Sequence, residues 1–301
     1  MKKWMSKYSQ QLFLSAVLLI ICAVLAGKSE YFFTWKNIRN ILEAASYRMI
    51  LAVGMTFVIA SGVMDLSAGS IVSLCGVLTG IAAGGLMGAL NGALIHCTGI
   101  NFFVLTLASG GMLRGISLMI TDGKPITKFG KAFMQLGIGR IGEFQFPVLF
   151  ALTLILLSSP LMFHVKWGNY VQALGGSETA LKRSGVRTGF YRISVHVFLG
   201  ITAAVTAVII TARLNSAEPN AGMNMELDAI TAVIMGGTPI RGGNASIAGT
   251  VLAVLILGII RNGLTLLSVS SDFQQWVTGF LLLASVLISE IRVWNTRALI
   301  K

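Results

Sequence analysis

Charged side chains are scarce in this chain of 301 residues, of which only 11% are Asp, Glu, Lys or Arg. A soluble domain needs about a quarter of its residues charged to cover its surface. Hydrophobic residues make up 55% of the chain, and its mean hydropathy is +0.80. The composition therefore excludes an ordinary soluble protein and indicates that water is not the only solvent around the chain.

Cysteine is equally scarce. The three cysteines, Cys22, Cys75 and Cys97, stand in apolar runs at unrelated spacings. Such a pattern fits neither a disulfide framework nor a cysteine-ligated metal site. We expect all three to pack in the interior of the protein.

Signals of catalysis are missing as well. The three histidines, His96, His164 and His196, have no metal-ligand spacing, and the sequence contains no Ser, Cys or Asp triad pattern. The glycine-rich stretch 236–243 lacks the Lys-Ser/Thr ending of a phosphate-binding loop, so we predict a tight re-entrant turn there. We expect no catalytic residue, no metal and no cofactor, and any energy source must belong to another chain.

Long apolar runs dominate the sequence. A helix needs about twenty apolar residues to cross roughly 30 Å of hydrocarbon, and a helix keeps its backbone hydrogen-bonded there. We predict an all-α polytopic membrane protein of about eight to ten transmembrane helices and half-helices, a single domain over residues 1–301 in the lipid bilayer. The runs without Asp, Glu, Lys or Arg are 12–26, 49–63, 69–99, 102–113, 146–163, 193–212, 229–240, 242–260 and 273–289.

The net charge of +12 comes from basic residues scattered over short loops. No run of five to eight stands together, so we predict no nucleic-acid partner. The basic residues that flank the first and last apolar runs are Lys2, Lys3, Lys7, Arg292, Arg297 and Lys301. By the positive-inside rule they place both termini in the cytoplasm. The N-terminus also resembles a secretory signal cleaved after residues 24–26, but we expect an uncleaved span because so many spans follow.

Two connections carry much of the remaining charge. Residues 121–145 contain four basic and two acidic residues, whereas residues 164–192 contain five basic residues and only Glu178 as an acid. The second connection is therefore the better candidate for a cytoplasmic loop. In it, Ser177 can cap a short helix that begins at Glu178 and ends at Gly185.

The chain also contains a weak internal repeat. Residues 65–70 resemble residues 244–250 with one residue inserted, and each stretch follows a short apolar segment that ends in glycine. Asn91-Gly92 and Asn262-Gly263 occupy comparable places further on. Such matches are typical of transporters built from repeats, although glycine-rich membrane helices can also resemble one another by composition alone.

Several polar residues interrupt the apolar runs. Asp65 and Ser67 can each cap a helix that begins near Ala68, and the same residues are compatible with a broken helix facing a substrate path. Arg114 and Arg261 stand within apolar runs, where a charge is costly. For both arginines we favour snorkelling or a structural ion pair over substrate contact.

Four motifs occur in one order between about Ile38 and Ser289. The first combines Gly54-Met55-Thr56, Ser61-Gly62 and residues 65–70, and the second combines residues 173–180 with Ser184-Gly185-Val186. The third combines residues 226–233 with Gly236-Gly237-Thr238 and Gly242-Gly243, and the fourth is Asn262-Gly263-Leu264. Together they resemble the ribose/xylose/arabinose/galactoside-type bacterial ABC transporter permeases.

The resemblance implies a core of two permease copies, as a homodimer or a heterodimer, in the bacterial inner membrane. An ABC ATPase is expected on its cytoplasmic face and a sugar-binding protein in the periplasm. The implied ATPase-coupling residues, within the loop near 164–192, are Gly175, Gly176, Ser177, Glu178, Ala180, Ser184 and Gly185. The candidates for the translocation pathway or a broken helix are Gly62, Asp65, Ser67, Asp228, Gly236, Gly237, Thr238 and Asn262.

One departure from the family concerns residues 69–99, because family members have more chain here, enough for an additional helix. At about 1.5 Å per residue this stretch makes either one long helix or two short ones. One helix would reverse the parity of all later spans and contradict the charge bias, so we predict two helices broken at Gly84-Gly85. The expected function is sugar import, and the alternatives are an autoinducer-2-type importer or an internally deleted, non-transporting remnant.

Overall fold

The computed structural model describes residues 9–298, which form thirteen α-helices and four strands of two residues each. This architecture confirms the predicted all-α membrane fold. The helices are α2 (Ser9–Lys28), α3 (Trp35–Ala60), α4 (Ala68–Leu78), α5 (Ile81–Thr98), α6 (Phe102–Thr121), α7 (Lys131–Ile138), α8 (Phe146–Phe163), α9 (Lys166–Gly176), α10 (Glu178–Arg183), α11 (Thr188–Leu214), α12 (Met225–Met235), α13 (Ile247–Leu266) and α14 (Ser271–Ala298).

The strands form two small antiparallel pairs. Strand β1 (Ile126–Thr127) pairs with β4 (Ser216–Ala217), and β2 (Arg140–Ile141) pairs with β3 (Phe144–Gln145). Both pairs belong to connections between helices and add no sheet layer to the fold.

Seven of the described helices are long and apolar enough to cross a membrane: α2, α3, α5, α6, α8, α11 and α13. Helix α4 is apolar but has only 11 residues, so it is a half-helix. Many of the large apolar side chains on α5, α6 and α8 point outward; Leu156, for example, is 72% exposed. Apolar surface of this extent suits lipid contact, and the chain is a multi-pass membrane protein.

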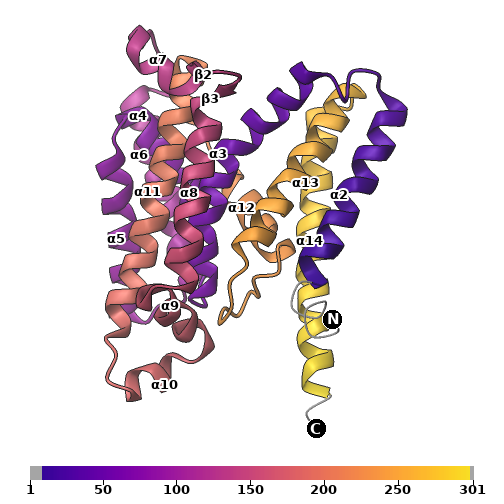
Figure 1. Cartoon of the computed structure of the whole chain (residues 1–301). Helices are drawn as coiled ribbons and strands as arrows, with labels where there is room; N and C mark the ends of the chain where they lie inside the picture. The colour runs from indigo at the N-terminus through magenta and orange to yellow at the C-terminus, as the bar shows by residue number, and fades with distance from the viewer. Residues whose placement is uncertain (1–8, 299–301) are drawn as a thin grey trace.

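The helices run between two ends of the molecule (Figure 1). Helices α9 and α10 lie at the lower end, where α2 starts and α14 finishes, whereas α7, β2 and β3 lie at the upper end. The connections on either side of α8 therefore lie at opposite ends. The charge argument for the termini stays a prediction, because Lys2, Lys3, Lys7, Lys301 and the side chains of Arg292 and Arg297 lie outside the described residues.

The stretch 69–99 folds as two helices, as predicted, but the predicted place of the break is wrong. The chain turns at Thr79, which has a left-handed φ of 46°, and Gly80. Gly84 and Gly88 lie inside α5, where a Cβ atom would overlap the carbonyl oxygens of Gly200 and His196 on α11. These glycines therefore permit close helix packing rather than a break.

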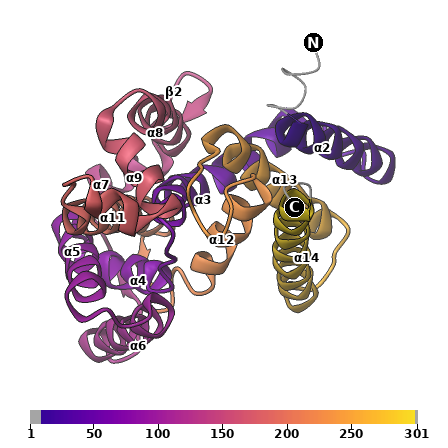
Figure 2. The ribbon, with the colours of Figure 1, turned by 90° about the horizontal axis from the view of Figure 1, so that it is seen from below.

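Helix α3 lies at the centre of the fold, between α8, α11, α12 and α13 (Figure 2). Its lower half is almost completely buried, from Met49 to Ala60. There the Phe57 ring packs against Trp167 and Phe198, with ring centroids 5.3 and 4.7 Å away. Two shorter helices, α4 and α12, complete this core.

Both short helices begin inside the protein after irregular segments. Residues 61–67 precede α4, and residues 218–224 precede α12. The second segment runs beside α4, because the Ser73 hydroxyl donates to the carbonyl of Pro219 and a Cβ on Gly222 would overlap Gly69. Irregular backbone at membrane depth is tolerated only where protein or a cavity surrounds it. The break before α4 was expected from the sequence, whereas the one before α12 was not.

Candidate functional site

The short helix α10 forms as the residues around it predict. The Ser177 hydroxyl accepts a hydrogen bond from the Ala180 N–H over 3.2 Å and so caps the helix. Ser184 ends the helix, and its hydroxyl donates to the Ala180 carbonyl. Gly185 follows with a φ of 79°, a conformation that favours glycine. Helix α10 is thus a capped, protruding helix at the lower end of the molecule (Figure 1).

Glu178 fastens α10 to the start of α11. Its Oε2 accepts from the Arg192 guanidinium over 2.6 Å, and its Oε1 accepts from the Thr188 hydroxyl over 3.2 Å. Lys182 adds an ion pair of 3.0 Å within α10. Partial burial by itself raises the pKa of the Glu178 carboxyl, but the Lys182 hydrogen bond and the Arg192 charge outweigh it, and the pKa is lowered overall. The carboxylate therefore stays ionised and holds the helix in place.

Four glycines bring three chain segments into backbone contact, and we call them the glycine junction: Gly62, Gly175, Gly242 and Gly243. They lie after α3, in α9 and in the loop between α12 and α13. The Gly243 N–H donates to the Ala60 carbonyl over 3.0 Å. A Cβ on Gly175 would overlap that carbonyl and the Gly243 nitrogen. The end of α9, directly before α10, is therefore in contact with the segment before α4 and with the loop after α12.

The segment before α4 holds a buried polar network. Asp65 Oδ1 accepts from the Ser67 N–H over 2.8 Å and from the Ser67 hydroxyl over 2.5 Å. The Ser67 hydroxyl in turn accepts from the Asn91 side chain of α5, and the Leu66 N–H donates to Thr106 of α6. Ser67 stands at the N-cap position but makes no side-chain cap, so that prediction is wrong. Its hydroxyl is committed to Asp65 and Asn91 instead.

The loop between α12 and α13 makes the tight turn that the glycines predict. Gly237 has a φ of 98°, and a Cβ on Gly236 would overlap the backbone of Thr250. Thr238 is completely buried, and its hydroxyl accepts from the Ser246 N–H over 3.1 Å. Ser246 then caps α13 by accepting from the Gly249 N–H. The structure therefore places the three candidates of this loop, Gly236, Gly237 and Thr238, in a tight turn next to the glycine junction.

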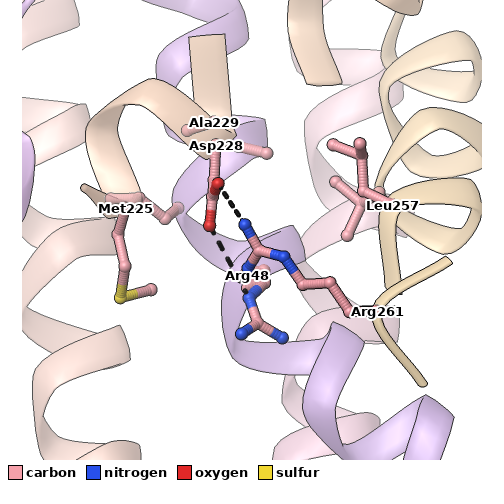
Figure 3. A pocket seen from close by; sticks show the side chains of 9 residues that line it. Arg48, Met225, Asp228, Ala229, Leu257 and Arg261 are labelled. Atoms are coloured by element: carbon pink, nitrogen blue, oxygen red, sulfur yellow. Dashed lines mark hydrogen bonds and ion pairs between the residues drawn. The ribbon is translucent and has the colours of Figure 1, made fainter. Parts of the chain in front are cut away.

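Asp228 lies between two arginines from different helices (Figure 3). Its Oδ1 accepts a hydrogen bond from Arg261 of α13, and its Oδ2 is 3.9 Å from the Nε of Arg48 on α3. Arg261 also donates to the Thr278 hydroxyl of α14 over 3.1 Å. The preference for a structural ion pair at Arg261 agrees with this geometry. Arg114 differs, because its Nη1 is buried without a hydrogen-bond partner among the described residues.

A polar cavity of about 490 Å³ opens beside this ion pair. Its wall comes from α12, α13, α14 and Arg48 of α3, and its polar side chains include Arg48, Asp228, Thr231, Arg261, Gln274 and Thr278. Ionisable residues within transmembrane helices are costly and mark functional sites, solute pathways among them. We call this space the polar cavity.

Asn262 has a different environment from the other candidates. Its side-chain amide and that of Asn37 donate to one another over 2.8 and 2.9 Å, which ties the end of α13 to the start of α3. Asn262 is absent from the described wall of the polar cavity. The two asparagines of the sequence repeat also occupy different places in the fold. Asn91 lies on α5, the second helix after the break at residues 61–67, whereas Asn262 lies on α13, the first helix after the loop that follows α12.

Sequence reasoning missed the role of Arg48 and the proximity of His196 to Asp65, whose Oδ2 lies 4.0 Å from the His196 Nε2. Arg48 immediately precedes the apolar run 49–63, and His196 interrupts the run 193–212. A charged or titratable residue at the edge of an apolar run, or inside one, is the sequence signal that could have identified them. Among the described residues, no three His, Cys, Asp or Glu side chains lie close enough together to hold a metal ion.

Comparison of the sequence with known proteins shows the family of this chain. Residues 73–286 match the family model described as a branched-chain amino acid transport system permease component. The ribose import permease protein of Escherichia coli (strain K12) is 37% identical over 291 residues, which cover 90% of this chain and 91% of that protein. No solved structure matches the chain.

Two further relatives from the same organism are similar over the same extent. The D-allose transport system permease protein is 34% identical and covers 91% of this chain and 90% of its own length. The L-arabinose transport system permease protein is 31% identical and covers 92% and 88%. The chain therefore belongs to this family of ABC transporter permeases.

Proposed function

We propose that this chain is the permease subunit of an ABC importer for a sugar in the bacterial inner membrane. The observation that carries the proposal is its similarity to ribose, allose and arabinose permeases over about nine tenths of both lengths. All three relatives are named for the transport of small monosaccharides. The chain itself performs no chemistry in this proposal, and ATP is hydrolysed by a separate subunit.

The polar cavity fits the passage of a sugar. Sugar hydroxyls both donate and accept hydrogen bonds, and the cavity offers carboxylate and amide acceptors together with guanidinium and amide donors. Its volume of about 490 Å³ exceeds the space that a single monosaccharide needs. We therefore assign the pathway to Asp228 and its neighbours, and a packing role to Asn262.

Helix α10 is the proposed contact for the ATPase. The loop near 164–192 has the stronger positive bias, which supports a cytoplasmic position for the lower end of the molecule. A rigid helix can transmit the closure of an ATPase as a rigid-body movement. The glycine junction then passes that movement to the segments before α4 and after α12.

The remaining partners follow from the family. A second permease copy, identical or related, completes the core, and a periplasmic binding protein delivers the sugar. The two alternatives have less support: the relatives named here are sugar permeases, and residues 69–99 form the two helices that a working topology needs. Neither autoinducer-2 transport nor a non-transporting remnant is favoured by any feature of the site.

Co-purification tests this proposal. The tagged permease, extracted in mild detergent from its native cell, is expected to retain an ABC ATPase whose ATP hydrolysis rises when a sugar-loaded binding protein is added. The matched control is a variant with Glu178→Lys, in which α10 loses its anchor to α11. A permease that purifies without any ATPase, under conditions that retain the ATPase of a known sugar importer, would contradict the proposal.

A further inference from the structure

Asp65 and His196 form a buried pair that the permease function does not explain. Both side chains are completely inaccessible to solvent, and Asp65 Oδ2 lies 4.0 Å from His196 Nε2. Within the described part of the chain, neither of these two atoms has a hydrogen-bond partner. Asp65 belongs to the broken segment before α4, and His196 lies two turns into α11. A buried polar atom without a partner costs free energy, so the pair requires an explanation.

The other nitrogen of the ring determines what Nε2 can do. His196 Nδ1 lies 2.8 Å from the backbone carbonyl oxygen of Arg192. A carbonyl oxygen only accepts, so Nδ1 must be the donor and carry a proton. In a neutral ring Nε2 is then a bare acceptor. It would face Asp65 Oδ2, which is also a bare acceptor when the carboxyl is ionised.

One additional proton resolves the conflict. If it lies on Nε2, an imidazolium donates to a carboxylate, and if it lies on Oδ2, a carboxylic acid donates to a neutral imidazole. In either arrangement the pair is neutral as a whole, which suits a site buried at membrane depth. The charged groups that act electrostatically on the ring are Asp65 and Arg192, and the Arg192 guanidinium is already paired with Glu178.

The pair also joins two functional regions. Arg192 binds Glu178 of α10 through its guanidinium and His196 through its carbonyl. Asp65 binds Ser67, which is held by Asn91 of α5. Helix α5 packs closely against the histidine, because a Cβ on Gly88 would overlap the His196 backbone. The contacts therefore run from α10 to the break before α4 with one gap, which lies between Asp65 and His196.

We propose that Asp65 and His196 share one proton, and that His196 is a positioning residue linking the coupling helix α10 to the break before α4. The two atoms lie 4.0 Å apart, so sharing a proton requires Asp65 and His196 to approach to hydrogen-bond distance, and that approach closes the last gap in this series of contacts. A movement of α10 then reaches the α4 break through side chains as well as through the glycine junction. The second half of this statement rests on the proposed transport function, whereas the shared proton does not.

The shared proton is tested by 15N NMR on permease labelled at histidine. The chain has three histidines, and His96 and His164 are exposed, so His96→Gln and His164→Gln leave His196 as the single signal. We expect a protonated Nδ1, together with either a protonated Nε2 or a carboxylic acid infrared band that disappears in Asp65→Asn. A bare Nδ1 would overturn the proposal, and so would a bare Nε2 beside an ionised Asp65.

The link is tested by comparing Asp65→Asn with Asp65→Leu in the assembled transporter. Asparagine can donate from Nδ2 to His196 and accept from Ser67 through Oδ1, so it restores the contact without a shared proton. We expect sugar uptake within about twofold of wild type for Asp65→Asn, and a loss of at least about tenfold for Asp65→Leu with ATP hydrolysis continuing. Equal impairment of both variants, or normal uptake by Asp65→Leu, would overturn the link.

Two controls separate the possible failures. If Asp65→Leu does not insert into the membrane, His196→Leu takes its place, and the NMR experiment still decides the shared proton. If the wild-type complex takes up no sugar, the proposed function fails and the link fails with it. The protonation of His196 remains measurable in that case, because it needs only the purified permease.

Discussion

The Arg192 guanidinium lies 2.6 Å from the Glu178 carboxylate, so a residue at the start of α11 holds the short helix α10 in place. Only 10% of the Arg192 side chain is exposed, which makes this the best-shielded ion pair that α10 forms. Shielded pairs depend on both partners, because removing one leaves the other charge without compensation. The position of α10 therefore depends on Glu178 more than on the exposed Lys182.

Reversing the charge at Glu178 is expected to uncouple the transporter. Glu178→Lys places a third cation beside Arg192 and Lys182, so α10 should leave α11 while the membrane spans stay intact. We expect sugar uptake and stimulated ATP hydrolysis to fall at least about tenfold. Lys182→Ala is the matched control, because its exposed pair contributes little. Normal stimulation in Glu178→Lys would remove α10 from the coupling route.

Two adjacent glycines provide a matched pair of variants at the glycine junction. A Cβ on Gly175 would overlap the Ala60 carbonyl, whereas a Cβ on Gly176 meets no atom of the described residues within 4 Å. Gly175→Ala should therefore lower the melting temperature of the purified permease and reduce uptake, and Gly176→Ala should leave the melting temperature unchanged. Equal behaviour of the two variants would show that the close contact at Gly175 is unimportant.

We predict opposite effects for substitutions in the polar cavity and in the Asn37–Asn262 amide pair. Asp228→Asn keeps the shape of the cavity but removes the charge that faces Arg261, so uptake should fall with little change in the amount of inserted protein. Asn262→Ala breaks the hydrogen bonds to Asn37 and should lower thermal stability while uptake per inserted molecule stays normal. The measurement is sugar uptake normalised to membrane protein, together with a melting curve. Reversed effects would place the pathway at Asn262.

Much of this site could be predicted from the sequence because its signals are local. The cap at Ser177 and the left-handed Gly185 define α10 within a few residues, and the turn at Gly237 is similarly local. Long-range partners left no such signal. Arg48 and Asp228 are 180 positions apart in the chain, and only the packing of α3 against α12 brings them together.

The position of the break between α4 and α5 shows another limit. Gly84-Gly85 looked like a helix break, but glycine in a membrane helix also permits close packing, and a local pattern does not distinguish these roles. The α11 backbone packs directly against Gly84, so this glycine permits close packing and α5 continues through it. The chain turns instead at Thr79, which has a left-handed backbone conformation. His196 was likewise considered only as a metal ligand, because its partner Asp65 is distant in the sequence.

Topology is tested by labelling single cysteines. With Cys22, Cys75 and Cys97 replaced, a cysteine at Lys131 in α7 should react with a membrane-impermeant reagent added to the periplasmic side. A cysteine at Lys182 in α10 should react only after the membrane is opened, because the loop with the stronger positive bias lies inside. The opposite pattern would turn α10 away from the cytoplasmic ATPase and contradict its coupling role.

Uptake of labelled sugar tests the central claim most directly. The chain is expressed with its ATPase and binding protein in an Escherichia coli strain that lacks its ribose, allose and arabinose permeases, and uptake of each of these sugars is measured. We predict concentrative, ATP-dependent uptake of at least one sugar, and its loss in Glu178→Lys. Correct insertion and ATPase assembly without uptake of any sugar would contradict the assignment of this chain as a sugar permease.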